Sequence, residues 1–142
     1  MIGPGAIIIV NSKIFIVEDQ MILANDLKLQ LEKLGYVVVG IAGNGKKAIK
    51  KIGETKPDLI LMDIVIRGDM DGIETAQKIR DLYNIPFMYL TAYFDDEILE
   101  RASLTQPYGY VTKPYNEISL NTAIKLALCK YHIEQKNNKS KL

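Results

Sequence analysis

Charged and hydroxyl side chains that could bind a metal ion and a phosphate group follow four short apolar runs in this sequence. They are three carboxylates, one hydroxyl and one amine: Glu18, Asp19, Asp63, Thr91 and Lys113. When such runs form parallel strands of an open sheet, their carboxyl ends meet at one edge, and ligands bind there. The sequence therefore predicts that these side chains converge in one pocket.

The three carboxylates favour a bound divalent cation. Two carboxylates held about 4 Å apart repel each other by roughly 4 kcal/mol at an effective dielectric constant near 20, and a cation is the simplest compensation. Hard oxygen ligands that leave coordination positions open suit Mg²⁺, or Mn²⁺ in its place. We expect Glu18, Asp19 and Asp63 to be the ligands.

Phosphoryl transfer is the reaction that this set of groups fits. It requires an aligned nucleophile, with positive charge and hydrogen-bond donors around the phosphoryl oxygens. Asp63 could act as the nucleophile, while the Lys113 ammonium group and the Thr91 hydroxyl bind phosphoryl oxygens. Taken singly, these residues have ordinary roles, such as capping a helix or facing solvent. Their combination at successive strand ends is what predicts chemistry.

Apolar runs that alternate with helical patterns predict the elements that hold these residues. The expected strands cover residues 14–17, 36–41, 59–62, 86–90 and 108–111, and the expected helices cover 23–34, 48–52, 73–83, 95–105 and 116–133. The first helix has leucines at helical spacing, Leu23, Leu27, Leu31 and Leu34, and Gly35 ends it. This order is typical of an α/β fold with a parallel sheet covered on both faces by helices.

The chain is predicted to contain one domain, residues 13–133, with a short segment at each end. Residues 1–12 could be an extra edge strand, a cloning remnant or a misassigned start. Residues 134–142 are polar and are expected to be a frayed tail or a truncated linker.

Composition excludes several classes of partner. The 18 basic and 17 acidic residues leave a net charge of +1, which predicts no direct binding to nucleic acid through a broad basic surface. No apolar run approaches the roughly 20 residues of a membrane helix, so no membrane insertion is expected. The one cysteine, Cys129, cannot form an intramolecular disulfide, which favours the cytoplasm.

Four stretches of the sequence resemble the receiver domain of two-component response regulators. They are Ile16-Val17-Glu18-Asp19, Leu61-Met62-Asp63-Ile64 with Gly68 and Asp71-Gly72-Ile73-Glu74, Leu90-Thr91-Ala92, and Gly109-Tyr110-Val111-Thr112-Lys113-Pro114. The resemblance covers residues 13–133 and implies a flavodoxin-like, doubly wound sheet of five parallel strands in the order 2-1-3-4-5, with five helices.

The resemblance also implies what the domain does. Asp63 would accept a phosphoryl group from a sensor histidine kinase or a phosphotransfer protein, with Mg²⁺ held by Glu18, Asp19, Asp63 and the backbone carbonyl of Val65. Such a domain is a signalling phosphoacceptor and not an enzyme in the usual sense, since it catalyses only its own phosphotransfer and slow autodephosphorylation.

A conformational readout is implied at the other strand ends. Thr91, with Ala92 after it, would move toward the phosphoryl group, and the Tyr110 ring would turn inward behind it. The peptide bond between Lys113 and Pro114 would be cis. The fourth helix, fifth strand and fifth helix would then bind a downstream effector or a second copy of the chain.

Two flanking side chains are candidates for setting the lifetime of the phosphoryl group. Val65 is apolar and cannot orient an attacking water, and the bulky Tyr93 could shield the acyl phosphate. Both features would slow hydrolysis.

Two alternatives remain open at this stage. A degenerate receiver would act as an interaction module without being phosphorylated. A nucleotide could bind the P-loop-like stretch that contains Gly40, Gly45 and Lys46, although Lys47 stands where that motif needs a Ser or Thr for Mg²⁺.

Overall fold

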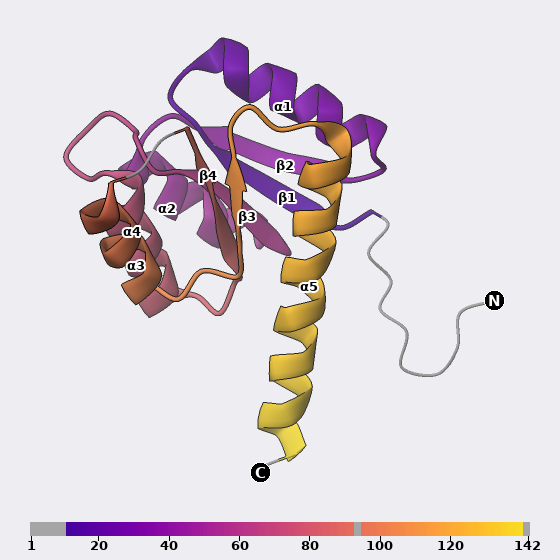
Figure 1. Cartoon of the computed structure of the whole chain (residues 1–142). Helices are drawn as coiled ribbons and strands as arrows, with labels where there is room; N and C mark the ends of the chain where they lie inside the picture. Colours follow the sequence, from indigo (N-terminus) through magenta and orange to yellow (C-terminus); the bar gives the residue numbers. More distant parts are fainter. Residues whose placement is uncertain (1–10, 93–94, 141–142) are drawn as a thin grey trace.

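A five-stranded parallel sheet forms the centre of the molecule in the computed structural model, which describes residues 11–92 and 95–140 (Figure 1). The strands are β1 (Lys13–Val17), β2 (Val37–Ala42), β3 (Leu59–Asp63), β4 (Phe87–Thr91) and β5 (Tyr110–Thr112). All neighbouring pairs are parallel, in the order β2-β1-β3-β4-β5. The predicted fold class and strand order are confirmed.

Helices cover both faces of the sheet. They are α1 (Met21–Lys33), α2 (Gly45–Thr55), α3 (Gly72–Leu82), α4 (Asp96–Leu104) and α5 (Glu117–Ser140). Helices α1 and α5 pack on one face and α2, α3 and α4 on the other, each over its own apolar core. Because side chains alternate along a strand, Ile14 and Ile16 of β1 enter the first core, while Phe15 and Val17 enter the second.

Polar side chains cap the starts of four helices, α2, α3, α4 and α5. The Asn44 side chain accepts the backbone N–H of Lys47 at 2.9 Å at the start of α2. At the start of α3, the Asp71 side chain accepts the N–H of Glu74 at 2.8 Å, and the two residues form a capping box. The α3 cap also ends the loop that follows Asp63.

The helix predicted from the leucine spacing is α1, although not every leucine of the run faces the core. Ala24, Leu27 and Leu31 are buried, whereas Leu23 is 42% exposed. Residues spaced by four rotate about 40° per step around an α-helix, so a run of leucines at that spacing leaves the core-facing stripe. Ala24, next to Leu23, faces the core instead.

The last helix is longer than predicted. Helix α5 continues beyond Ile133 to Ser140, through residues that were expected to be a frayed tail or linker. Distant segments hold this extension, since the Tyr108 hydroxyl donates to Glu134 at 2.5 Å and the Asn84 amide donates to Gln135 at 3.0 Å. These long-range contacts have no signature in local sequence.

The apolar run of the N-terminal extension lies outside the described residues, so the structure does not test the predictions for it.

Helix α4 is short, as the sequence predicts, and its buried residue is Ala102. Within residues 11–92 and 95–140, none of the helices has the length and apolar character needed to cross a bilayer.

Candidate functional site

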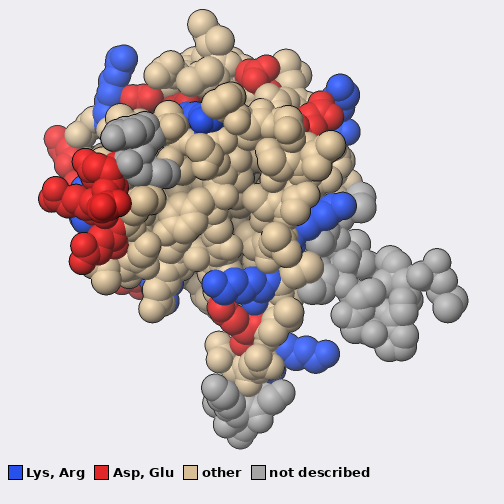
Figure 2. Space-filling view, viewed as in Figure 1, with Lys and Arg blue, Asp and Glu red and all other residues tan. Residues whose placement is uncertain are grey.

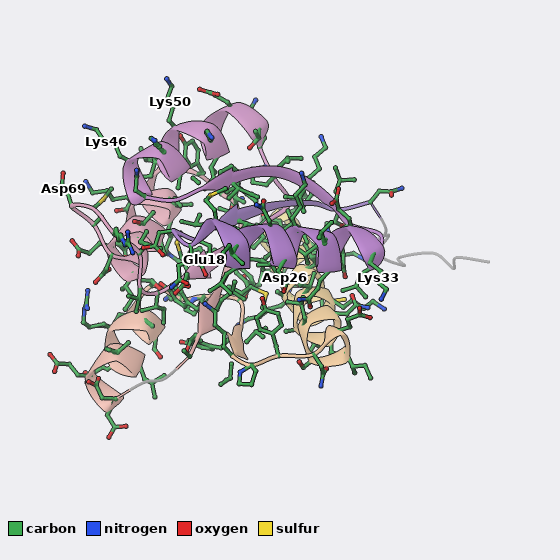
Figure 3. All side chains as sticks on the ribbon, turned by 90° about the horizontal axis from the view of Figure 1, so that it is seen from above. Glu18, Asp26, Lys33, Lys46, Lys50 and Asp69 are labelled. Carbon is green, nitrogen blue, oxygen red and sulfur yellow. The ribbon has the colours of Figure 1, made fainter. Side chains whose placement is uncertain are left out.

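Three of the predicted side chains meet at the carboxyl edge of the sheet. The Lys113 amine lies 2.7 Å from Oδ2 of Asp63 and 3.4 Å from Oε1 of Glu18. These residues follow or end three different strands, β1, β3 and β5. Figure 3 shows Glu18 inside the molecule, whereas Lys46, Lys50 and Asp69 point outward at its rim.

Asp63 is held in one orientation. It is the last residue of β3 and is 7% exposed. Its Oδ1 accepts the backbone N–H of Val65 at 3.0 Å, while Oδ2 faces Lys113. Gly72, the first residue of α3, lies so close to the Asp63 backbone carbonyl that a Cβ there would collide with it. The loop between β3 and α3 is therefore closed tightly around this carboxylate.

The surroundings of Glu18 oppose ionisation of its carboxyl group. Only 3% of the residue is exposed, and burial, reinforced by the negative charge of Asp63, raises the pKa of its carboxyl from 4.5 to about 7. The nearby Lys113 amine opposes this rise. Burial lowers the pKa of Lys113 itself, but its hydrogen bond with Asp63 and the attraction of both carboxylates outweigh burial, so that pKa is raised.

Asp19 faces a different cation. Its Oδ2 accepts the backbone N–H of Arg67 at 3.1 Å and lies 3.5 Å from Nε of the same arginine. Arg67 belongs to the loop between β3 and α3, which also carries Val65. Sequence reasoning missed this contact, although a cation in the loop after the candidate nucleophile was a visible signal.

The predicted readout residues Thr91 and Tyr110 lie on the neighbouring strands β4 and β5. Thr91 ends β4 and is buried, and Ala92 after it is exposed. Tyr110 on β5 is 40% exposed, and its hydroxyl lies 3.2 Å from Oγ of Ser103 on α4. The peptide bond between Lys113 and Pro114 is cis, the geometry expected from the sequence. Tyr93 lies outside the described residues.

The sheet topology agrees with comparisons with known proteins. The family model described as response regulator receiver domain matches residues 14–125. The chain belongs to the response regulator receiver domain family. Transcriptional regulatory protein PdtaR of Mycobacterium tuberculosis is 34% identical over 133 residues, covering 92% of this chain and 64% of the relative. YdfI of Bacillus subtilis, also named a transcriptional regulatory protein, is 33% identical over 103 residues, covering 72% and 48%.

Solved structures carry the same fold. The receiver domain of a modulated diguanylate cyclase from Desulfovibrio desulfuricans superposes with a TM-score of 0.82 at 36% identity, covering 87% of this chain and 98% of the other. The N-terminal domain of a three-domain response regulator from Carboxydothermus hydrogenoformans gives 0.78 at 38% identity, covering 86% and 98%. The receiver chain spans less than two thirds of the curated relatives' length.

The receiver pocket has the donors that a divalent cation needs. Receiver domains typically bind Mg²⁺ at the acidic pocket. In the described part of the chain, no three His, Cys, Asp or Glu side chains form a group that could hold a metal ion; Lys113 contacts Asp63, and Arg67 contacts Asp19. Oε2 of Glu18 and Oγ1 of Thr91 are nevertheless buried, and none of the residues that the structure describes forms a hydrogen bond with either oxygen. Unpaired buried oxygens are costly, so these residues fit a metal and a phosphoryl group as ligands.

The P-loop-like stretch has a packing explanation in this receiver. Gly40 lies against the Phe15 ring and Gly45 against the Thr75 hydroxyl, and a Cβ at either position would collide with these groups. The glycines therefore allow β2 and α2 to approach their neighbours. Packing is thus enough to explain why glycine stands at these two positions, without a bound nucleotide.

Proposed function

We propose that this receiver domain is a phosphorylation-controlled switch in which Asp63 is the phosphoacceptor. The observation that carries the proposal is the contact between Lys113 and Asp63, at 2.7 Å in a largely buried pocket. It gives a carboxylate with a fixed orientation and a cation beside the position where negative charge develops during transfer. Family membership supports a signalling switch in general, and this geometry supports the assignment of residues.

The proposed reaction is a simple displacement. An oxygen of the Asp63 carboxylate attacks phosphorus, the bond from phosphorus to the donor histidine nitrogen breaks, and its electron pair stays on that nitrogen, which takes up a proton from water. Lys113 and the Thr91 hydroxyl would bind phosphoryl oxygens. Glu18, Asp19, Asp63 and the Val65 carbonyl would hold Mg²⁺, which supplies positive charge to the transferring group.

The proposed donor is a sensor histidine kinase or a phosphotransfer protein, and the proposed compartment is the cytoplasm. Asp63 is the last residue of β3, at the carboxyl edge of the sheet, and the donor side chain would approach it from that edge. Val65 beside it is 75% exposed and lacks a polar group that could orient water. We expect Val65, together with Tyr93, to slow hydrolysis of the phosphoryl group. Equal dephosphorylation rates in wild type, Val65→Asn and Tyr93→Ala would contradict this role.

The proposed output face is formed by α4, β5 and α5. Leu104 and Tyr110 expose apolar surface there. Figure 2 shows acidic side chains gathered on the α4 side, where Asp96, Glu97 and Glu100 are exposed. An effector or a second copy that binds this face needs apolar contacts and positive charge.

The readout proposed for this face couples two hydroxyl-bearing residues. Thr91 would move toward the phosphoryl group, where its Oγ1 would gain a hydrogen-bond partner that none of the described residues provides. Tyr110 would leave Ser103 and turn inward. The Tyr110 ring already lies 5.9 Å from the ring of Tyr89, centroid to centroid. Light scattering with and without beryllofluoride tests self-association, and an unchanged mass would argue against it.

The deciding experiment is incubation with acetyl phosphate and Mg²⁺, followed by intact mass. We expect the wild type to gain one phosphoryl group and Asp63→Asn to gain none. Asp81→Asn is the matched control, because Asp81 is an exposed carboxylate at the end of α3. No gain in the wild type would favour the degenerate receiver, and a nucleotide titration would then test Gly40, Gly45 and Lys46.

A further inference from the structure

Arg67 reaches the acidic pocket from its solvent side. The Arg67 side chain is 88% exposed, whereas the Asp19 side chain that it contacts is only 12% exposed. Both the backbone N–H and Nε of Arg67 approach the same atom, Oδ2 of Asp19, at 3.1 and 3.5 Å. The charged end of an exposed side chain therefore lies against a carboxylate that is mostly buried.

The two cations of the pocket divide the three carboxylates between them. Lys113 contacts Asp63 and Glu18, and Arg67 contacts Asp19. Lys113 is held by a hydrogen bond of 2.7 Å and is mostly covered, with 24% of its side chain exposed. Arg67 is much the more easily displaced of the two, because its side chain can swing into water without leaving a buried charge.

We propose that Arg67 is a built-in competitor for the metal, which occupies Asp19 in the metal-free protein and lowers the affinity of the receiver for Mg²⁺. This inference rests on the proposed function, in which Asp19 is a metal ligand. A cation that contacts the ligand must move away before Mg²⁺ binds at that oxygen. Its positive charge also repels the incoming ion.

Charge, and not loop shape, is the predicted origin of the effect. The backbone N–H of Arg67 also donates to Asp19, and this bond does not depend on the side chain. Replacing the arginine therefore leaves the loop tied to Asp19 through its backbone. Arg67→Gln removes the positive charge. Arg67→Lys keeps it and should therefore behave like the wild type.

The expected effect is modest because the pair is exposed. Ion pairs at exposed positions are worth little, which corresponds to about a two- to fivefold change in a binding constant. We expect Arg67→Gln to bind Mg²⁺ about two- to fivefold more tightly than the wild type, and Arg67→Lys to stay close to the wild type. The gain should shrink at high salt, because ions screen surface charge.

Calorimetric titration of the unphosphorylated chain with MgCl₂ measures this affinity directly. Lys50→Gln is the matched control, since it removes one positive charge from a side chain that points away from the pocket (Figure 3). In a parallel NMR titration, the Arg67 Nε–H signal should shift with the same midpoint as the calorimetric curve. A structural role alone would not link that signal to metal binding.

The outcomes separate this inference from the function on which it rests. Equal or weaker Mg²⁺ binding by Arg67→Gln, with normal binding by the wild type, would overturn the competitor role and leave the phosphoacceptor assignment standing. Tighter binding by Lys50→Gln to the same degree would overturn it too, since net charge would then be the cause. Absence of Mg²⁺ binding by the wild type would overturn both.

Discussion

Replacing Glu18 by glutamine is expected to stabilise the metal-free receiver domain, more so at alkaline than at acidic pH. The amide keeps the shape of the side chain but cannot carry a negative charge, and only 3% of this residue is exposed. Burial and the neighbouring Asp63 raise the pKa of this carboxyl from 4.5 to about 7. The folded protein thus resists ionisation of Glu18.

The sign and size of the effect follow from proton linkage. Between pH 4.5 and about pH 7, the folded protein keeps the Glu18 proton and the unfolded chain has lost it. The free energy of unfolding therefore falls as pH rises through this window and levels off above it. Ionisation of Glu18 lowers the free energy of unfolding by about 3 kcal/mol near pH 8 and by less than about 1 kcal/mol near pH 5. The advantage of Glu18→Gln should grow by about 2 to 3 kcal/mol between these conditions.

Urea unfolding followed by circular dichroism, with EDTA present, measures this difference at both pH values. Glu97→Gln, at an exposed carboxylate on α4, controls for the change in net charge. Added Mg²⁺ at pH 8 should narrow the gap, because the wild type would bind it more tightly and be stabilised by it. A gap of equal size at both pH values would refute the reasoning, since the penalty would then not come from ionisation.

Three further substitutions test the packing and charges around the pocket. Lys113→Met removes the amine that lies 2.7 Å from Asp63. It should lower the free energy of unfolding of the metal-free protein in urea by about 1 to 3 kcal/mol, and Mg²⁺ should restore part of this loss. Unchanged stability would contradict the contact. Gly72→Ala places a Cβ against the Asp63 carbonyl and should lower the free energy of unfolding by about 2 to 3 kcal/mol or more. Gly109→Ala should be nearly neutral, because no described atom lies within 4 Å of the position of its Cβ. Similar values for both variants would be inconsistent with the structure. Asp71→Ala should lower the free energy of unfolding by about 1 to 2 kcal/mol through loss of its helix cap, and Asp71→Asn should recover most of it in thermal melting.

The sheet was predictable because its central strands are buried on both faces. Residues 59–63 of β3 and 87–91 of β4 are buried throughout, so they stand out in the sequence as continuous apolar runs. Helix ends were harder to predict. Helix α5 continues past Ile133, where Tyr108 and Asn84, which are distant in sequence, form hydrogen bonds with Glu134 and Gln135. Local periodicity carries no information about such partners.

The candidate site divides in the same way. Residue order along the chain is enough to show which side chains gather at the sheet edge, because parallel strands bring their carboxyl ends to one edge whatever the details of packing. It does not show how the cations pair with the carboxylates. The folded chain shows that Lys113 contacts Asp63 and Glu18, whereas Arg67 contacts Asp19. Those pairings depend on the directions of the side chains and on the path of the loops. Both are set by packing of the core, which involves residues far from the pocket in sequence.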